Sequence, residues 1–204
     1  MMKSTNLSDR TDFEAATGSP CSLNFRGVNL SNSTAPLDTI FIKCDFSGAD
    51  LSKTDLSGLT FRECLLQQTD FTDCILIGTK FTDKSDLTSA ILHRVDAKKS
   101  VFSNSNLSKV EATDGEFNGA DFFESKLEQS RFYRSDLTDV ENFSPDRTYI
   151  SEAVISGKTV DKWTVLRTEY TGLNLIISMF PAAIFVVSLL VKTYASIALS
   201  VSVR

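Results

Sequence analysis

Large apolar residues recur at every fifth position over about half of this chain. The interval holds without a gap from Phe41 to Phe81, and after one extra residue it resumes at Leu87 and continues to Leu137. Eighteen of these twenty positions hold Leu or Phe, and the other two hold Ala97 and Ala112. A period of five matches neither the 3.6-residue period of an amphipathic helix nor the alternation of a half-buried strand.

A second track of small residues lies two positions before each large one. Ser, Thr, Cys, Ala, Val or Gly occupies this track everywhere except at Leu59, and the residue between the two tracks is often Asp or Asn. We expect a chain with straight sides of five residues, each turning one large and one small side chain inward. Four sides close a turn of 20 residues, and successive turns stack by backbone hydrogen bonds at about 4.8 Å. The lumen is narrow, which explains the small track.

This register predicts which side chains stack on one another. One face carries a structural ladder made of Phe41, Phe61, Phe81, Phe102 and Phe122, and another carries Phe46, Leu66, Leu87, Leu107 and Leu127. The extra residue near Asp83-Lys84-Ser85 is expected at a corner. Cys44 and Cys64 fall one turn apart, within reach of a disulfide in principle. Buried free thiols are favoured for a cytosolic chain.

The repeated unit is small–Asp/Asn–Leu/Phe followed by two variable residues, as in the runs CDFSG, ADLSK and TDLSG. In this it resembles the pentapeptide-repeat proteins. The resemblance covers residues 39–141, and two earlier units fall within residues 23–32. It implies an all-β solenoid, a right-handed quadrilateral parallel β-helix. The functions of that family are diverse, so the resemblance predicts the fold and not the function.

The chain divides into five expected segments. Residues 1–24 form an N-terminal cap, with a short helix over residues 8–16 that begins after Ser8. Residues 25–144 form the β-helix, from which residues 31–38 are expected to make an excursion. Residues 145–172 form a cap, with a hairpin or irregular stretch at 148–160 and then a short amphipathic helix. A hydrophobic helix at 173–191 and a tail at 192–204 complete the chain.

The hydrophobic helix is long enough to cross a membrane. The 22 residues from 170 to 191 carry no charge, and at 1.5 Å per residue they extend for about 33 Å, against roughly 30 Å for a bilayer core. The predicted membrane-facing residues are Leu173, Ile176, Phe180, Ile184, Val187 and Leu190. The alternative is a segment that caps the rod or forms a homodimer, as the resemblance implies for gyrase-protecting members. Lys158, Lys162 and Arg167 before the segment favour a repeat domain on the cytoplasmic side.

Composition and motifs argue against catalysis. The net charge of −5 and the pI near 5.0 disfavour a general nucleic-acid binder. The sequence contains no GxGxxG, GxxxxGK[ST], HExxH or GxSxG motif, and its one histidine, His93, is expected to face solvent. The repeated aspartates occupy one slot of the repeat, where we expect them to bond turn backbone: Asp45, Asp50, Asp55, Asp70, Asp86, Asp96, Asp121 and Asp136. We therefore predict no enzyme activity, no metal and no cofactor.

Two classes of function fit these features. The first is a membrane-tethered scaffold that presents its faces to a protein partner. The second, implied by the resemblance, is an acidic rod that imitates DNA and binds gyrase; residues 39–142 carry 18 Asp or Glu and 12 Lys or Arg, a net of −6. A secreted effector or immunity-type role is a further alternative. An exposed apolar patch would favour the scaffold, and a continuous acidic stripe would favour the mimic.

Overall fold

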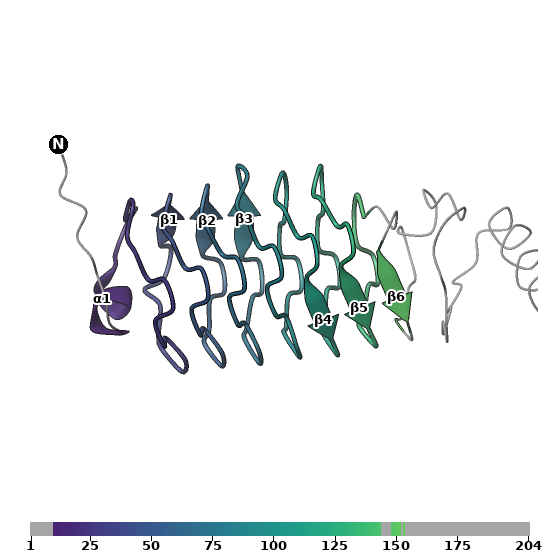
Figure 1. The fold of residues 1–204 in the computed structure, drawn as a ribbon, viewed down its shortest axis with the longest axis horizontal. Helices are drawn as coiled ribbons and strands as arrows, with labels where there is room; N and C mark the ends of the chain where they lie inside the picture. The colour runs from purple at the N-terminus through teal and green to yellow at the C-terminus, as the bar shows by residue number, and fades with distance from the viewer. Residues whose placement is uncertain (1–9, 144–147, 152, 154–204) are drawn as a thin grey trace, which may run out of the picture.

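The computed structural model describes residues 10–143, 148–151 and 153, which form a rod of stacked coils (Figure 1). Here a coil means one full turn around the rod. The elements are helix α1 (Arg10–Ala15) and the strands β1 (Ile40–Ile42), β2 (Thr60–Arg62), β3 (Lys80–Thr82), β4 (Glu111–Thr113), β5 (Arg131–Tyr133) and β6 (Tyr149–Ser151). The strands form two parallel sheets, β1-β2-β3 and β4-β5-β6, which lie on opposite edges of the rod in Figure 1.

The pairing register confirms the 20-residue coil. Phe41 pairs with Phe61, and Phe61 with Phe81. Isolated parallel bridges such as that between Asp50 and Asp70 continue the pairing between strands. Beyond the predicted extra residue the spacing becomes 21 for one coil, as between Lys80 and Val101. Asp83 and Lys84 both take positive φ, 53° and 72°, so the corner absorbs the extra residue.

The buried centres of the repeats define four sides of the rod, each made of residues stacked along its axis. Side 1 contains Phe25, Phe46, Leu66, Leu87, Leu107 and Leu127; side 2 contains Leu30, Leu51, Phe71, Leu92, Ala112 and Phe132; side 3 contains Ala35, Leu56, Leu76, Ala97, Phe117 and Leu137; side 4 contains Phe41, Phe61, Phe81, Phe102 and Phe122. The five rings of side 4 stack in succession, with centroids 5.1–5.3 Å apart.

The small track has a hydrogen-bonding role as well as a steric one. Thr69 Oγ1 donates to the Phe46 carbonyl at 2.8 Å, and Thr79 Oγ1 donates to the Leu56 carbonyl at 2.7 Å. Ser105 Oγ makes the same bond to the Phe81 carbonyl at 2.9 Å. Each donor reaches the centre residue of the preceding coil, so the small hydroxyls join one coil to the next inside the lumen. This explains why so many of the small residues are Ser or Thr.

The corners are tight turns that use positive φ. After Phe46, the Ala49 N–H donates to the Phe46 carbonyl at 2.9 Å, and Gly48 has φ 67°. A closing bond of this kind with positive φ at the third residue is the pattern of a type II turn. Lys53 and Gln68 occupy the same corner position with φ 59°. The corner therefore accepts ordinary side chains once stacking has fixed the backbone.

The N-terminal end of the rod corrects one prediction. Residues 31–38 do not leave the coil, because Thr34 bridges Asp55 and Ala35 is buried as a repeat centre. One extra residue, Asp38 with φ 58°, restores the phase before Phe41. Helix α1 covers this end, where the Phe13 ring stacks on Phe41 at 5.6 Å with an interplanar angle of 4°.

The C-terminal end of the rod corrects a second prediction. The sequence predicted a hairpin or irregular stretch over 148–160, but in its described part β6 continues the parallel sheet, with Ile150 paired to Phe132, and residues 152 and 154–160 lie outside the described residues. Ala153 is fully buried. The short helix after residue 160, the hydrophobic segment at 173–191 with its six named residues, and the tail at 192–204 lie outside the described residues, as do residues 1–9. Among the described residues, no helix has the length and apolar character needed to cross a membrane.

Candidate protein-interaction surface

The predicted structural ladder lies inside the rod and is not available to a partner. The rings of Phe41, Phe61, Phe81 and Phe102 are completely buried, and that of Phe122 is nearly so. Surface chemistry must therefore come from the outward positions, namely the residue before each centre and the two after it. Large apolar side chains are exposed at a few of them: Leu37, Leu65, Ile75, Ile77 and Phe123.

The repeated aspartates are structural, as predicted. In all eight, the Oδ1 atom accepts the backbone N–H of the residue two positions later, at 2.8–3.0 Å in seven cases and 3.4 Å at Asp96. This is the local bond by which Asp stabilises a turn. The pairing of these carboxylates with nearby backbone, and not with one another, leaves no acid–base dyad among them.

Charges of alternating sign follow the corner between sides 2 and 3. We call this set the charge ladder: Lys53, Asp73, Arg94, Asp114 and Arg134, one from each of five successive coils. Arg94 binds Asp73 through two bonds of 2.6 and 2.9 Å. Arg134 binds Asp114 through two bonds of 2.7 and 2.6 Å. Each pair links one coil to the next.

The charge ladder makes the titration of Asp73 a test of the register. Hydrogen bonds from the Arg94 guanidinium hold the pKa of Asp73 below its ordinary value of 3.8. Replacing Arg94 with glutamine is expected to raise that pKa, as followed by the ¹³Cγ shift of Asp73. The stability that this pair supplies is present above the unfolded pKa and is lost as pH falls through the lowered folded pKa. An unchanged Asp73 titration in Arg94→Gln would contradict the pairing.

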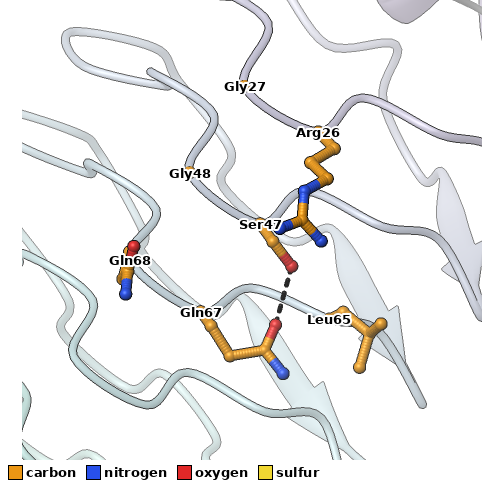
Figure 2. A pocket seen from close by; sticks show the side chains of 7 residues that line it. All are labelled: Arg26, Gly27, Ser47, Gly48, Leu65, Gln67 and Gln68. Carbon is orange, nitrogen blue, oxygen red and sulfur yellow. Dashed lines mark hydrogen bonds between the residues drawn. The ribbon is translucent and has the colours of Figure 1, made fainter.

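A surface hollow lies at the corner between sides 1 and 2 (Figure 2). We call it the notch; its volume is about 600 Å³, and its lining consists of Arg26, Gly27, Ser47, Gly48, Leu65, Gln67 and Gln68. The hollow exists because the first two coils carry glycine at this corner, with nothing within 4 Å of where a Cβ would stand. In Figure 2 the Arg26 side chain extends toward Ser47, whose hydroxyl bonds the Gln67 Oε1 atom at 2.7 Å.

The four cysteines are free thiols. Cys21 is exposed, whereas Cys44, Cys64 and Cys74 are buried in the small track. The Cys64 thiol donates to the Phe41 carbonyl at 3.3 Å. The neighbouring Cys44 thiol and burial raise the pKa of Cys64, and burial raises the pKa of Cys74 to about 12. The buried thiols therefore belong to the packing of the lumen.

Thiol labelling should separate these cysteines. In the native protein at pH 8 we expect an alkylating reagent to label Cys21 quickly and the three buried thiols only after urea is added, because the reagent cannot reach Cys44, Cys64 and Cys74 inside the folded rod. Mass spectrometry of the labelled peptides measures this directly. Fast native labelling of Cys74 would show that the lumen is open to solvent.

His93 was expected to face solvent, but its side chain is half-buried. Its Nδ1 atom is shielded from solvent and has no hydrogen-bond partner. Over residues 10–143, 148–151 and 153, no group of three or more His, Cys, Asp or Glu is arranged to hold a metal ion.

Comparison with known proteins agrees with this architecture. The family model described as pentapeptide repeats matches in eight copies, over residues 44–83, 59–104 and 100–139. Among solved structures, HetL, a pentapeptide repeat protein involved in heterocyst differentiation regulation from the cyanobacterium Nostoc sp. strain PCC 7120, has a TM-score of 0.54 at 14% identity. The similarity covers 68% of this chain and 73% of HetL. At this level of identity the similarity to HetL supports the fold alone.

Two further structures are similar at lower TM-scores. A pentapeptide repeat protein from the thylakoid lumen of Arabidopsis thaliana is 31% identical, with 50% of this chain and 71% of that chain covered and a TM-score of 0.47. QnrB1, a plasmid-mediated fluoroquinolone resistance protein, is 19% identical, with 77% and 79% covered and a TM-score of 0.44. No protein with a curated description matches the sequence.

Stacked coils with one large and one small inward side chain per five residues define a solenoid repeat protein. The matching repeats place it more closely: residues 44–139 of the chain are repeats of the pentapeptide-repeat family.

Sequence reasoning missed the notch and the charge ladder. Each is assembled from successive coils that lie about 20 residues apart in the sequence, so its members are brought together only when the corners are assigned to coils. A signal for the ladder was present, because Lys53, Asp73, Arg94, Asp114 and Arg134 follow the repeat centres of one side at a constant offset.

Proposed function

We propose that this protein is a non-catalytic scaffold that binds a protein partner through the outward positions of its rod. The observation that carries the proposal is the exposure of Leu65, Ile75 and Ile77, each 41–45% exposed. Leu65 and Ile75 stand in the slot where nine of the twenty repeats centred on Phe41 to Leu137 carry a turn-capping Asp or Asn. These residues give up a local hydrogen bond and place apolar side chains on two sides of a rigid rod, Leu65 on side 1 and Ile75 on side 3, where a partner protein would cover them.

The pattern of acidic residues favours this scaffold over an imitation of DNA. A DNA mimic needs carboxylates along the rod that are free to meet the cationic surface of its partner. Here nearby cations neutralise many of them, as Lys98 does for Asp96 in its own coil and for Glu116 in the next coil. Ile75 also interrupts the line of Asp55 and Asp96 to which it is bridged. Asp96, Glu116 and Asp136 do lie in line on three successive coils, but Lys98 pairs with the first two of them, so part of this acidity is already neutralised.

Membrane tethering is the second part of the proposal. It rests on the sequence alone, through the uncharged stretch at 170–191 and the basic residues Lys158, Lys162 and Arg167 that precede it. In this arrangement the repeat domain lies on the cytoplasmic side, and the hydrophobic segment holds one end of the rod at the bilayer.

Crosslinking in cells tests the scaffold. A photoreactive phenylalanine is placed in the full chain at one of four equivalent positions of a single coil, replacing Gln67, Thr72, Ile77 or Thr82, one on each side of the rod. We expect adducts with a defined protein from one or two sides and none from the others, so that the silent sides serve as controls. Adducts with DNA, or no adduct from any side, would contradict the proposal.

Carbonate extraction tests the tether. The full chain is expected to stay in the membrane pellet, and the double variant Phe180→Arg and Ile184→Arg to leave it, because each charge at a bilayer centre costs about 2.5–3.5 kcal/mol on insertion scales. Ser200→Arg, in the tail, is the matched control and should stay in the pellet. Release of the unaltered chain by carbonate would remove the tether and leave the scaffold proposal in place.

A further inference from the structure

We propose that the notch between sides 1 and 2 binds an extended segment of a partner protein in which a carboxylate side chain stands two residues from an apolar one. The inference rests on the proposed scaffold function and names the site and the chemistry of the partner. Three features of the notch support the inference. One guanidinium has no carboxylate partner, one apolar residue occupies a position that is usually polar, and glutamine amides lie beside open space.

The guanidinium belongs to Arg26. The other arginines with described side chains each approach a carboxylate of an adjacent coil at 2.6–3.6 Å: Arg62, Arg94, Arg131 and Arg134. Among the residues that the structure describes, Arg26 has no such partner, and it is exposed at the rim of the notch. A guanidinium offers two parallel N–H donors to a carboxylate. Four arginines bind a carboxylate of this chain, whereas the guanidinium of Arg26 remains available to a carboxylate of a partner.

The apolar residue is Leu65, at the far end of the notch. The corresponding positions of side 1 include Asn24, Asp45 and Asp86, each of which accepts the backbone N–H two residues later. Leucine cannot make that bond, and Leu65 remains 45% exposed. A residue that breaks the local rule without a packing gain is expected where a site has been built.

The amides and the open space complete the site. Gln67 is held at both ends, because its Oε1 atom accepts from Ser47 and its Nε2 atom donates to Asp86 Oδ2 at 2.8 Å. Gln68 is exposed beside it. The notch extends over three coils, or about 10 Å at the usual spacing of adjacent strands, which matches three residues of extended chain. In Figure 2 the guanidinium lies between the first and third coils. A carboxylate two residues from an apolar side chain therefore fits both ends.

A peptide fits these features better than a simple anion or a nucleic acid. Nucleic-acid binding draws on many phosphate contacts, whereas the notch offers one cation. Inorganic phosphate would use Arg26 and leave Leu65 without a role. A chain with an acidic and an apolar side chain two residues apart uses the guanidinium, the leucine and the glutamine amides together.

Two synthetic peptides serve as probes, acetyl-Gly-Leu-Ser-Glu-Gly-amide and its twin with glutamine in place of glutamate. Each is titrated into the ¹⁵N-labelled full chain in detergent, and amide and Arg Nε signals are followed by NMR. We expect shifts confined to Arg26, Leu65, Gln67, Gln68 and their neighbours. The acidic peptide should bind about tenfold more tightly than its twin, since the bond to the guanidinium is charge-assisted.

Matched variants make the assignment falsifiable. Arg26→Gln should abolish the preference for the acidic peptide, and Gly48→Gln should weaken both peptides by filling the notch. The control is Gly78→Gln, at another corner with φ 65° against 67° for Gly48, and likewise with nothing within 4 Å of an added Cβ. Gln68 and Gln129 already adopt φ 59° and 62° at the corner of Gly48, so both substitutions are compatible with the fold.

Several results would overturn the proposal. These are an acidic preference that survives in Arg26→Gln, equal effects of Gly48→Gln and Gly78→Gln, or shifts that map to another side. Inorganic phosphate that shifts Arg26 as strongly as the acidic peptide would show a simple anion site instead. Crosslinks in cells from other sides, with no peptide response here, would reject the notch and leave the scaffold intact. The absence of every crosslink would instead reject the scaffold.

Discussion

Replacing Phe81 with aspartate is expected to abolish cooperative folding of the rod. The Phe81 ring is fully buried between Phe61 and Phe102, with centroids 5.1 and 5.3 Å away. Removing a buried phenylalanine side chain costs about 3–5 kcal/mol, and the carboxylate adds the cost of a buried charge without a partner. Domains are stable by about 5–15 kcal/mol in total, so this single change consumes much or all of the margin.

Far-ultraviolet circular dichroism during a urea titration measures this effect. Phe123→Asp is the matched control, because Phe123 lies on the same side of the rod but is 47% exposed. It should shift the free energy of unfolding by no more than about 0.5 kcal/mol. Since each coil contacts only its neighbours, unfolding of only the coils next to Phe81 would appear as a partial loss of the signal. An unchanged melting curve for Phe81→Asp would refute the assignment of inward and outward positions.

Most of the fold follows from the sequence because each side turns one large residue inward. With a period of five, the positions of Phe41, Phe61 and Phe81 determine a common side without any knowledge of long-range contacts. Even the corner that absorbs an extra residue at Lys84 follows from the phase shift in the sequence. Because every side follows the same five-residue pattern, that local pattern is enough to determine which residues stack in the folded rod.

The pattern fails where the inward residue is small or the spacing changes. Ala35 resembles a loop residue in sequence, because it precedes Pro36 and lies in a run of Ser, Asn and Thr. In the structure its neighbours supply the register, and Asp38 takes up the extra residue. At β6 the spacing from Phe132 to Ile150 is 18 and not 20. Strand β6 is held in place by its pairing with β5, and because its spacing departs from 20 residues the five-residue period does not reveal it.

The contacts between surface side chains were less predictable than the packing inside the lumen, and the reason is physical. Corner residues share a backbone conformation that accepts Gly, Lys, Asp, Arg or Gln, so the repeat does not constrain them. The charge ladder and the notch arise from which of these side chains meet across coils. The open guanidinium of Arg26 becomes visible only when the partners of the other arginines are known.

The second large effect is expected at Gly115, where consensus reasoning and the structure predict opposite signs. Serine is common in the small track, and Ser85, Ser105 and Ser135 each donate to a carbonyl of the preceding coil. By that pattern, Gly115→Ser would add a hydrogen bond and stabilise the rod. In the structure, however, a Cβ at Gly115 would stand 2.6 Å from Phe117 Cε2 and 3.3 Å from Val95 Cγ2.

We therefore expect Gly115→Ser to destabilise the protein by about 1–3 kcal/mol, the usual cost of overpacking a full core. Phe117 is itself fully buried and cannot move outward to relieve the contact. A double-mutant cycle with Phe117→Leu, followed by urea unfolding, identifies the cause. The smaller side chain should remove most of the cost of the serine, which gives a coupling of about 1 kcal/mol or more. Additive effects, or a stabilising Gly115→Ser, would show that the Phe117 ring does not fill the space against Gly115.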